Sequence, residues 1–98
     1  MKHFIIISTY TIPFEQLGDN IADHRAFLQT GYDNGMLLCS GPQAAKTGGA
    51  LVARFSSMDE LKRFFEGDPY QQRGLAKYQF IEFDPVKRQA FLEEWVKG

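Results

Sequence analysis

The chain has 98 residues, 44% of them hydrophobic, and a formal net charge of −1 from eleven basic and twelve acidic side chains. This length fits one folded unit, so we expect a single domain over residues 1–98, and the apolar content excludes a disordered chain. The charges are scattered without a basic stripe, which argues against nucleic-acid binding and against anchoring to an acidic membrane surface.

A single cysteine excludes an internal disulfide and a Cys-rich zinc site, and the two histidines are not spaced as a metal-binding pair. We therefore expect no metal. We expect no cofactor either, because Gly48–Gly49 lacks the Lys-Ser/Thr that completes a phosphate-binding loop. The apolar run near the N-terminus is too short for a signal peptide or a spanning helix, so the cytoplasm is the expected location.

Residues 3–10 predict the first strand, because β-branched and aromatic side chains dominate this short run and leave both of its faces apolar. Residues from about 13 to 34 predict a helix that ends at Asn34–Gly35. Its start has two solutions. Pro13 suits a first helical position, whereas Gly18–Asp19 can break the helix and cap it again.

The rest of the chain alternates short strands and helices. The sequence first predicts a strand over 36–40 stopped by Gly41–Pro42, a loop over 43–49 and a strand over 50–55. A helix follows, opened by the capping box Ser57-Met58-Asp59-Glu60 and ended by Gly67. The last predicted elements are a turn or single-turn helix from Asp68, a strand over 76–83, and a final helix capped by Asp84–Pro85.

This order of elements, followed by a helical tail, is the ferredoxin-like βαββαβ plan of the α+β class. Right-handed crossovers place both helices on one face of the sheet. The first and last strands are nevertheless apolar on both faces, and an uncovered apolar face of that size marks an interface. We therefore expect a homodimer in which two sheets pack face to face as a dimeric α+β barrel.

His24 lies near the centre of the apolar arc of the first helix on a helical wheel. One interpretation is a buried histidine whose ring is satisfied by a backbone carbonyl. The other is a general acid or base in a pocket between the helix and the sheet, since a free imidazole titrates close to neutral pH. The second interpretation requires a partner that orients the ring.

Asp68 is the candidate partner. An aspartate before proline is a common way to cap a helix, which explains Asp68–Pro69 without any role in a reaction. Alternatively, the carboxylate accepts a hydrogen bond from one imidazole nitrogen, which fixes the tautomer and orients the ring. Both helices cover the same sheet face, so the side chains of His24 and Asp68 can converge at one end of that layer.

Other side chains are candidates for the walls of the pocket. They are Ser40, Gly41 and Pro42 after the second strand, Phe27 on the first helix, and Tyr70 and Arg73 beside Asp68. Ser40 lacks the G-x-S-x-G pattern of a serine nucleophile. Outside the pocket we expect His3 to face solvent, Cys39 to be a small buried residue, and Arg54 to form an ion pair rather than to bind an anionic substrate.

The motifs of the chain resemble those of YciI-like proteins in order and spacing, from the first strand to Phe83. They are His24-Arg25-Ala26-Phe27-Leu28, Gly35-Met36-Leu37-Leu38-Cys39-Ser40-Gly41-Pro42, Gly49 at a strand start, and Asp68-Pro69-Tyr70, where the family often has phenylalanine in the last position. The resemblance implies a dimeric α+β barrel with His24 and Asp68 as a His–Asp pair in a cleft. The tail from Pro85 to Gly98 is longer than in a minimal member, and we expect it to pack on the partner subunit or to cover the cleft.

Two functions of different kinds fit this pattern. The first is an enzyme of the lyase or isomerase type, or one that catalyses an elimination, acting on a small cyclic or phenolic substrate: His24 moves the proton and Asp68 orients His24. The second is a non-catalytic module that binds a small ligand or another protein, in which the same pair only holds the helices together. We favour the enzyme, and a solvent-accessible cleft lined by both residues distinguishes it from the module.

Overall fold

The computed structural model describes all residues from Met1 to Gly98. Its elements are, in chain order, β1 (Lys2–Tyr10), the 3-10 helix η1 (Phe14–Gln16), α1 (Asn20–Asp33), β2 (Leu37–Pro42), β3 (Gly49–Phe55), α2 (Met58–Phe65), α3 (Pro69–Gln72), β4 (Ala76–Phe83), the 3-10 helix η2 (Ala90–Leu92) and α4 (Glu93–Lys97). None of these helices combines the length and the apolar character needed to cross a membrane.

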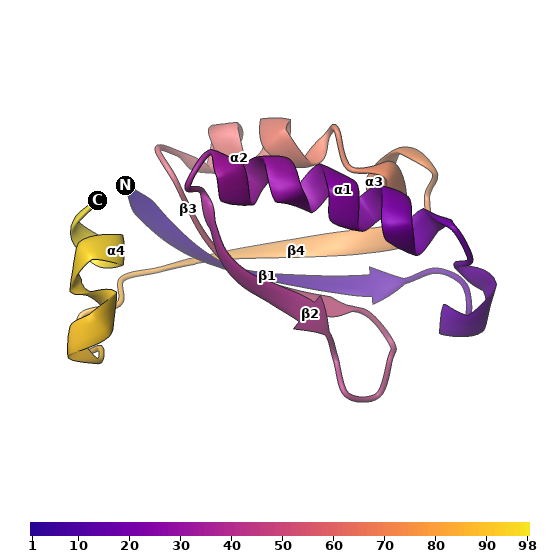
Figure 1. The fold of residues 1–98 in the computed structure, drawn as a ribbon, viewed down its shortest axis with the longest axis horizontal. Coiled ribbons are helices and arrows are strands. Elements are labelled where there is room, and N and C mark those ends of the chain that lie inside the picture. Colours follow the sequence, from indigo (N-terminus) through magenta and orange to yellow (C-terminus); the bar gives the residue numbers. More distant parts are fainter.

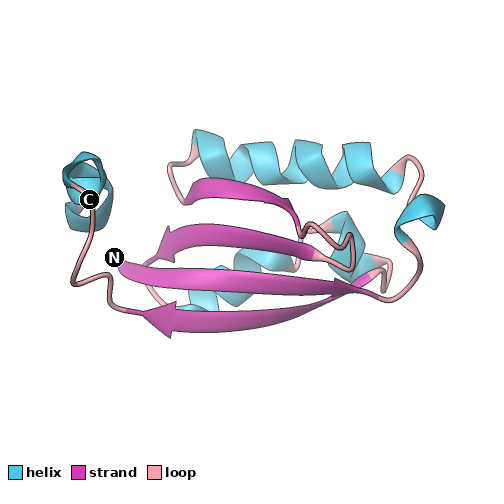
Figure 2. Ribbon diagram, turned by 90° about the horizontal axis from the view of Figure 1, so that it is seen from below, coloured by secondary structure: helices cyan, strands magenta, loops and turns pink.

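The four strands form one antiparallel sheet in the order β2-β3-β1-β4. Helices α1 and α2 lie across one face of this sheet, and the opposite face has no helix over its centre (Figures 1 and 2). On the central strand β1, Ile6 lies opposite Leu51 of β3 and opposite Phe80 of β4. This topology confirms the predicted α+β fold with ferredoxin-like βαββαβ order.

The core lies between the sheet and the two long helices. Alternate residues of a strand point to the same face, so Phe4 and Ile6 of β1 both reach the core and are fully buried. From the helix side, Leu61 and Phe65 stand one turn apart on α2 and are also fully buried. The sheet thus holds the helix layer in a fixed position, and that layer carries the candidate site.

The helix starts follow the capping residues of the sequence, and one open choice is resolved. Helix α1 begins at Asn20. Gly18 adopts a left-handed φ of +54°, which interrupts the helical backbone between the single turn of η1 and the start of α1. Leu17, between the two segments, is fully buried. At the start of α2, the Ser57 hydroxyl accepts a hydrogen bond from the backbone N–H of Glu60 at 3.1 Å, as the capping box predicts.

The second strand differs from its predicted extent. It continues through Gly41 and Pro42 after a register shift between Leu37 and Cys39. A proline is tolerated there because β2 is an edge strand, whose outer side needs no hydrogen-bond donors. The prediction of a buried Cys39 was wrong: the same edge position leaves this cysteine exposed.

The C-terminal segment also differs from the prediction. Asp84–Pro85 does not start a helix, and the chain runs without regular structure before it forms the short helices η2 and α4. Val86 and Phe91 are exposed, so this segment lacks the buried apolar stripe that stabilises a long helix. Helix α4 lies at the end of the sheet where β1 begins (Figure 1).

This tail covers two residues for which the predictions were wrong. His3 is buried, not solvent-facing, and its Nε2 lies 3.3 Å from the carbonyl oxygen of Val96. Arg54 forms no ion pair. It donates hydrogen bonds to the carbonyl oxygens of Gly35 and Trp95, and its guanidinium lies 4.2 Å from the centroid of the Trp95 ring.

The sheet face away from α1 and α2, called the open face below, carries the apolar side chains of Ile5, Ile7, Val52, Ile81 and Phe83. Ile81 and Phe83 are among the large exposed hydrophobic residues of the chain. The sequence predicted this uncovered apolar surface. The homodimer expected to bury it stays a prediction.

Candidate active site

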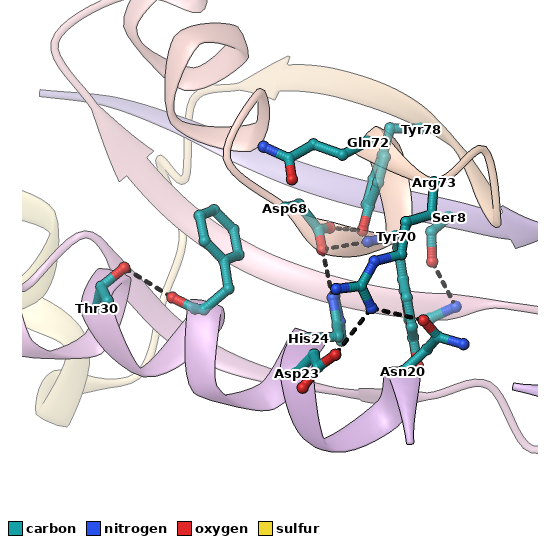
Figure 3. A network of polar contacts seen from close by, with 12 residues as sticks. Ser8, Asn20, Asp23, His24, Thr30, Asp68, Tyr70, Gln72, Arg73 and Tyr78 are labelled. Carbon is teal, nitrogen blue, oxygen red and sulfur yellow. Dashed lines mark hydrogen bonds and ion pairs between the residues drawn. The ribbon is translucent and has the colours of Figure 1, made fainter. Parts of the chain in front are cut away.

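His24 lies on the side of α1 that faces the sheet, where it is mostly buried. Its Nδ1 lies 2.8 Å from Oδ1 of Asp68, a residue 44 positions further along the chain (Figure 3). The fold therefore brings together the two side chains that the sequence indicated as a pair. Their part in a reaction stays a prediction.

The Asp68 carboxylate is fully buried and accepts three hydrogen bonds. Oδ1 accepts from His24 and from the backbone N–H of Tyr70 at 3.0 Å, and Oδ2 accepts from the hydroxyl of Tyr78 (Figure 3). Asp68 is also the N-cap of α3, with Pro69 at the first helical position. The structural and the functional interpretations of Asp68 are therefore compatible, because one carboxylate caps a helix and contacts the imidazole.

The hydrogen bond to Asp68 decides which nitrogen of His24 carries the proton. A carboxylate only accepts, so Nδ1 is the donor and the neutral ring has its lone pair on Nε2. No buried side-chain nitrogen or oxygen of the chain lacks a hydrogen-bond partner, and Nε2 makes no hydrogen bond within the chain. Nε2 is therefore accessible to solvent or to a bound molecule, as a general base must be.

The ring of Tyr70 packs against one face of the His24 imidazole. The two rings are parallel, with 5° between the planes and 3.9 Å between the centroids. Burial, then the neighbouring hydroxyl of Tyr10 and the charge of Asp68, raise the pKa of Tyr70 to about 12, although Arg25 opposes the rise. The Tyr70 hydroxyl is therefore protonated at neutral pH.

Tyr78 belongs to the same network but was not identified from the sequence. Strand alternation puts Tyr78 on the same face of β4 as Phe80, and the structure packs both against the core, but no spacing rule shows that its hydroxyl meets Asp68. Burial, followed by the negative charge of Asp68, raises the pKa of Tyr78 well above its ordinary value. Its hydroxyl therefore remains a donor, and it binds Oδ2 of Asp68 while His24 binds Oδ1.

A cavity of about 170 Å³ opens beside His24 and Tyr70. Its apolar wall is formed by Phe14, Ile21, Leu28, Pro42 and Leu51. Among the residues predicted for a pocket, Ser40, Gly41, Pro42 and Tyr70 line it together with His24, and their contact with a substrate stays a prediction. Nowhere in the chain do three or more His, Cys, Asp or Glu side chains come close enough to hold a metal ion.

Two residues expected in the pocket lie elsewhere. Phe27 packs against Phe64 in the core, with 4.6 Å between ring centroids, because its position on α1 points toward α2 and not toward the cavity. Arg73 forms an ion pair with Asp23 at 2.8 Å, which ties α3 to α1 outside the cavity (Figure 3).

The fold and the site define the class of the protein: a ferredoxin-like α+β domain with a carboxylate–imidazole pair, of which the imidazole of His24 lines a small cavity and the fully buried carboxylate of Asp68 does not. The chain belongs to the YCII-related domain family, which matches residues 1–84. The tail from Pro85 lies outside this match. Protein YciI of Escherichia coli and Protein YciI of Shigella flexneri are each 31% identical to the chain over 75 residues, which cover 66% of this chain and 74% of theirs.

A solved structure supports the same assignment. It is 5-chloro-2-hydroxyhydroquinone dehydrochlorinase from Burkholderia phenoliruptrix, in complex with 2,5-dihydroxybenzoquinone. The TM-score is 0.61 at 26% sequence identity, and the match covers 88% of this chain and 92% of that chain. A protein of similar fold is thus an enzyme that acts on a small ring compound.

Proposed function

We propose that the chain is a small-molecule enzyme of the YciI-like type that transfers protons by general acid–base catalysis. His24 is the group that exchanges the proton, and Asp68 is the positioning residue that orients its ring. The substrate class is a small cyclic or phenolic compound, and the reaction is an elimination or an isomerisation. One observation carries this proposal: His24 donates through Nδ1 to a fully buried carboxylate and leaves Nε2 accessible beside a cavity.

In the proposed reaction, Nε2 of His24 accepts a proton from the bound substrate. The electron pair left on the substrate expels an anionic leaving group in an elimination, or moves a double bond in an isomerisation. The imidazolium then returns its proton to the product or to water. Asp68 stabilises the charged ring through Nδ1, and the parallel ring of Tyr70 adds a favourable cation–π contact at the moment the charge forms.

The comparison supports the substrate class, because the dehydrochlorinase of similar fold acts on a chlorinated hydroxyhydroquinone and holds a dihydroxybenzoquinone. The size of the cavity supports it independently. A cavity of about 150 Å³ is large enough to bind benzene, so the 170 Å³ beside His24 accommodates one six-membered ring with small substituents.

The test measures proton abstraction without assuming the natural substrate. The chain is incubated in D₂O with 2,5-dihydroxybenzoquinone, and exchange of the ring protons is followed by NMR; chloride release is followed with 5-chloro-2-hydroxyhydroquinone. We expect the chain to accelerate at least one process and His24→Ala to lower that rate about 10²- to 10⁴-fold. Arg63→Gln, on the exposed side of α2, is the matched control with an unchanged rate. A His24→Ala variant as fast as the parent chain contradicts the proposal.

A second candidate function rests on the burial of Asp68, which joins α1, α3 and β4 through its three hydrogen bonds. Such a network also suits a non-catalytic module that binds a small ligand. In that case His24→Ala lowers the free energy of unfolding by about 1–3 kcal/mol, as expected for a disrupted buried hydrogen bond, and no ring compound undergoes exchange. Measuring stability and exchange on the same variant separates the two functions.

A further inference from the structure

Arg25 carries the only permanent charge on the wall of the cavity beside His24. None of the ion pairs of the chain includes it. The residues one turn away on α1 do not neutralise the positive charge of Arg25 either. They are uncharged: Ile21, Ala22, Leu28 and Gln29. An arginine beside a cavity and without a carboxylate partner has its hydrogen-bond donors available for a ligand.

Two tyrosine hydroxyls lie near this positive charge. Tyr10 and Tyr70 line the same cavity and their rings meet edge to face, with 5.9 Å between centroids. Burial raises the pKa of both hydroxyls, while the charge of Arg25 acts in the opposite direction on each of them. Both are therefore neutral donors at neutral pH, and the guanidinium is close enough to act on both.

No negative charge balances these donors at the cavity wall. The lining residues include no aspartate or glutamate. The carboxylate of Asp68, which is hydrogen-bonded to His24, is fully buried, and its other hydrogen bonds are to Tyr70 and Tyr78. The cavity thus presents one cation and several hydroxyl donors to a ligand, a combination that favours an anionic group over a neutral one.

We propose that Arg25, with the Tyr10 hydroxyl, forms a subsite for a negatively charged substituent, a carboxylate or an ionised hydroxyl, on a ligand with a single ring. The ring lies against the apolar wall of Phe14, Leu28 and Leu51, and the anionic substituent reaches the guanidinium. Arg25 then determines specificity and takes no part in proton transfer. This inference rests on the proposed function only in that it places the ligand in the cavity beside His24.

The test compares two ligands of the same shape that differ in charge, 4-hydroxybenzoate and 4-hydroxybenzamide, by isothermal titration calorimetry. A charge-assisted hydrogen bond in this geometry predicts that the parent chain binds the benzoate about tenfold more tightly than the amide. Arg25→Gln removes the preference, whereas Arg25→Lys keeps part of it. Arg63→Gln removes an arginine remote from the cavity and leaves the preference unchanged.

The subsite is refuted if the parent chain binds both ligands equally, if it binds neither, or if Arg25→Gln keeps the preference for the benzoate. Arg25 is exposed, so its variants are expected to fold, and circular dichroism of each variant checks this. The measurement is independent of turnover. A chain that prefers the anion through Arg25 but exchanges no proton supports the subsite and contradicts the proposed function.

Discussion

The rings of His24 and Tyr70 lie parallel, 3.9 Å apart between centroids, while Oδ1 of Asp68 lies 2.8 Å from Nδ1 of His24. Both contacts come from the same short segment, because Asp68 caps α3 and Tyr70 is the second residue of that helix. Three consecutive residues, with Pro69 fixing the turn between the other two, thus constrain the imidazole in orientation and in position. The Asp-Pro-Tyr motif therefore acts as one unit.

A comparison of Tyr70→Phe with Tyr70→Leu separates the contribution of the Tyr70 ring to stability from that of its hydroxyl. The Tyr70 hydroxyl makes no hydrogen bond within the chain, so Tyr70→Phe keeps the stack, and we expect the free energy of unfolding to change by less than about 0.5 kcal/mol. Tyr70→Leu loses the stack and the edge contact with Tyr10, which lowers stability by about 1–2 kcal/mol. Urea unfolding measures both values. Equal stabilities for the two variants would contradict the role given to the stack.

Asp68→Asn tests the three hydrogen bonds on one carboxylate. The amide retains one acceptor oxygen for three donors and turns an N–H group toward another donor, so we expect a loss of about 2–3 kcal/mol in the free energy of unfolding. Asp33→Asn, at an exposed end of α1, is the control, with a change of about 0.5 kcal/mol or less. If the two variants lose the same amount, the network does not stabilise the fold.

The raised pKa of Tyr70 predicts a fall in stability at alkaline pH. Burial, followed by the hydroxyl of Tyr10 and the charge of Asp68, raises this pKa to about 12 in the folded chain, whereas tyrosine in an unfolded chain titrates near pH 10. Between these values the unfolded chain releases a proton that the folded chain keeps, so the folded state binds more protons and stability decreases as the pH rises. The contribution is complete below about pH 10 and is lost toward about pH 12.

Urea unfolding from about pH 8 to about pH 12 checks this dependence on the parent chain and on Tyr70→Phe. Lysine and other groups also titrate in this range, but they are common to both chains. We expect the stability of the parent chain to fall more steeply above pH 10 than that of Tyr70→Phe. Parallel curves would show that the folded state does not raise the pKa of Tyr70.

The sequence predicted the pair of His24 and Asp68 because each stands in a local pattern, one in the apolar arc of a helix and the other before a proline. Their contact follows from the βαββαβ topology, which places both helices on one sheet face. The role of Tyr78 was not predicted because it depends on the register between β4 and β1. In this register Tyr78 lies opposite Ser8. Local patterns specify faces of strands and helices, but they do not specify the register that brings two side chains together.

The wrong predictions for the two residues that contact the C-terminal tail have a related cause. His3 and Arg54 were assigned from the strands in which they lie, and their partners Val96 and Trp95 come from the far end of the chain. No periodic pattern connects residues at such separations. The tail also lies outside the 1–84 region that matches the family, so the resemblance carried no information on its contacts.

Arg54→Met tests the attachment of the tail, with Trp95 as the reporter because it is the single tryptophan of the chain. The substitution removes the hydrogen bond to the Trp95 carbonyl at 2.8 Å and the cation–π contact with its ring. We expect red-shifted tryptophan fluorescence and faster proteolysis after Lys97 or Arg88, because the released tail is solvated. Arg63→Met is the control, and a fluorescence spectrum identical to that of the parent chain would contradict the attachment.

The open face predicts self-association through the sheet. Ile81 points away from the helices and is 40% exposed, so a charge at this position is tolerated in a monomer but is buried in a dimer that packs two open faces together. Light scattering at micromolar concentration should give the mass of a dimer for the parent chain and of a monomer for Ile81→Glu, with circular dichroism unchanged. Ala26→Glu, on the exposed side of α1, introduces the same charge away from the open face and should remain dimeric. A monomeric parent chain, or dissociation of both variants alike, would show that the open face is not the interface.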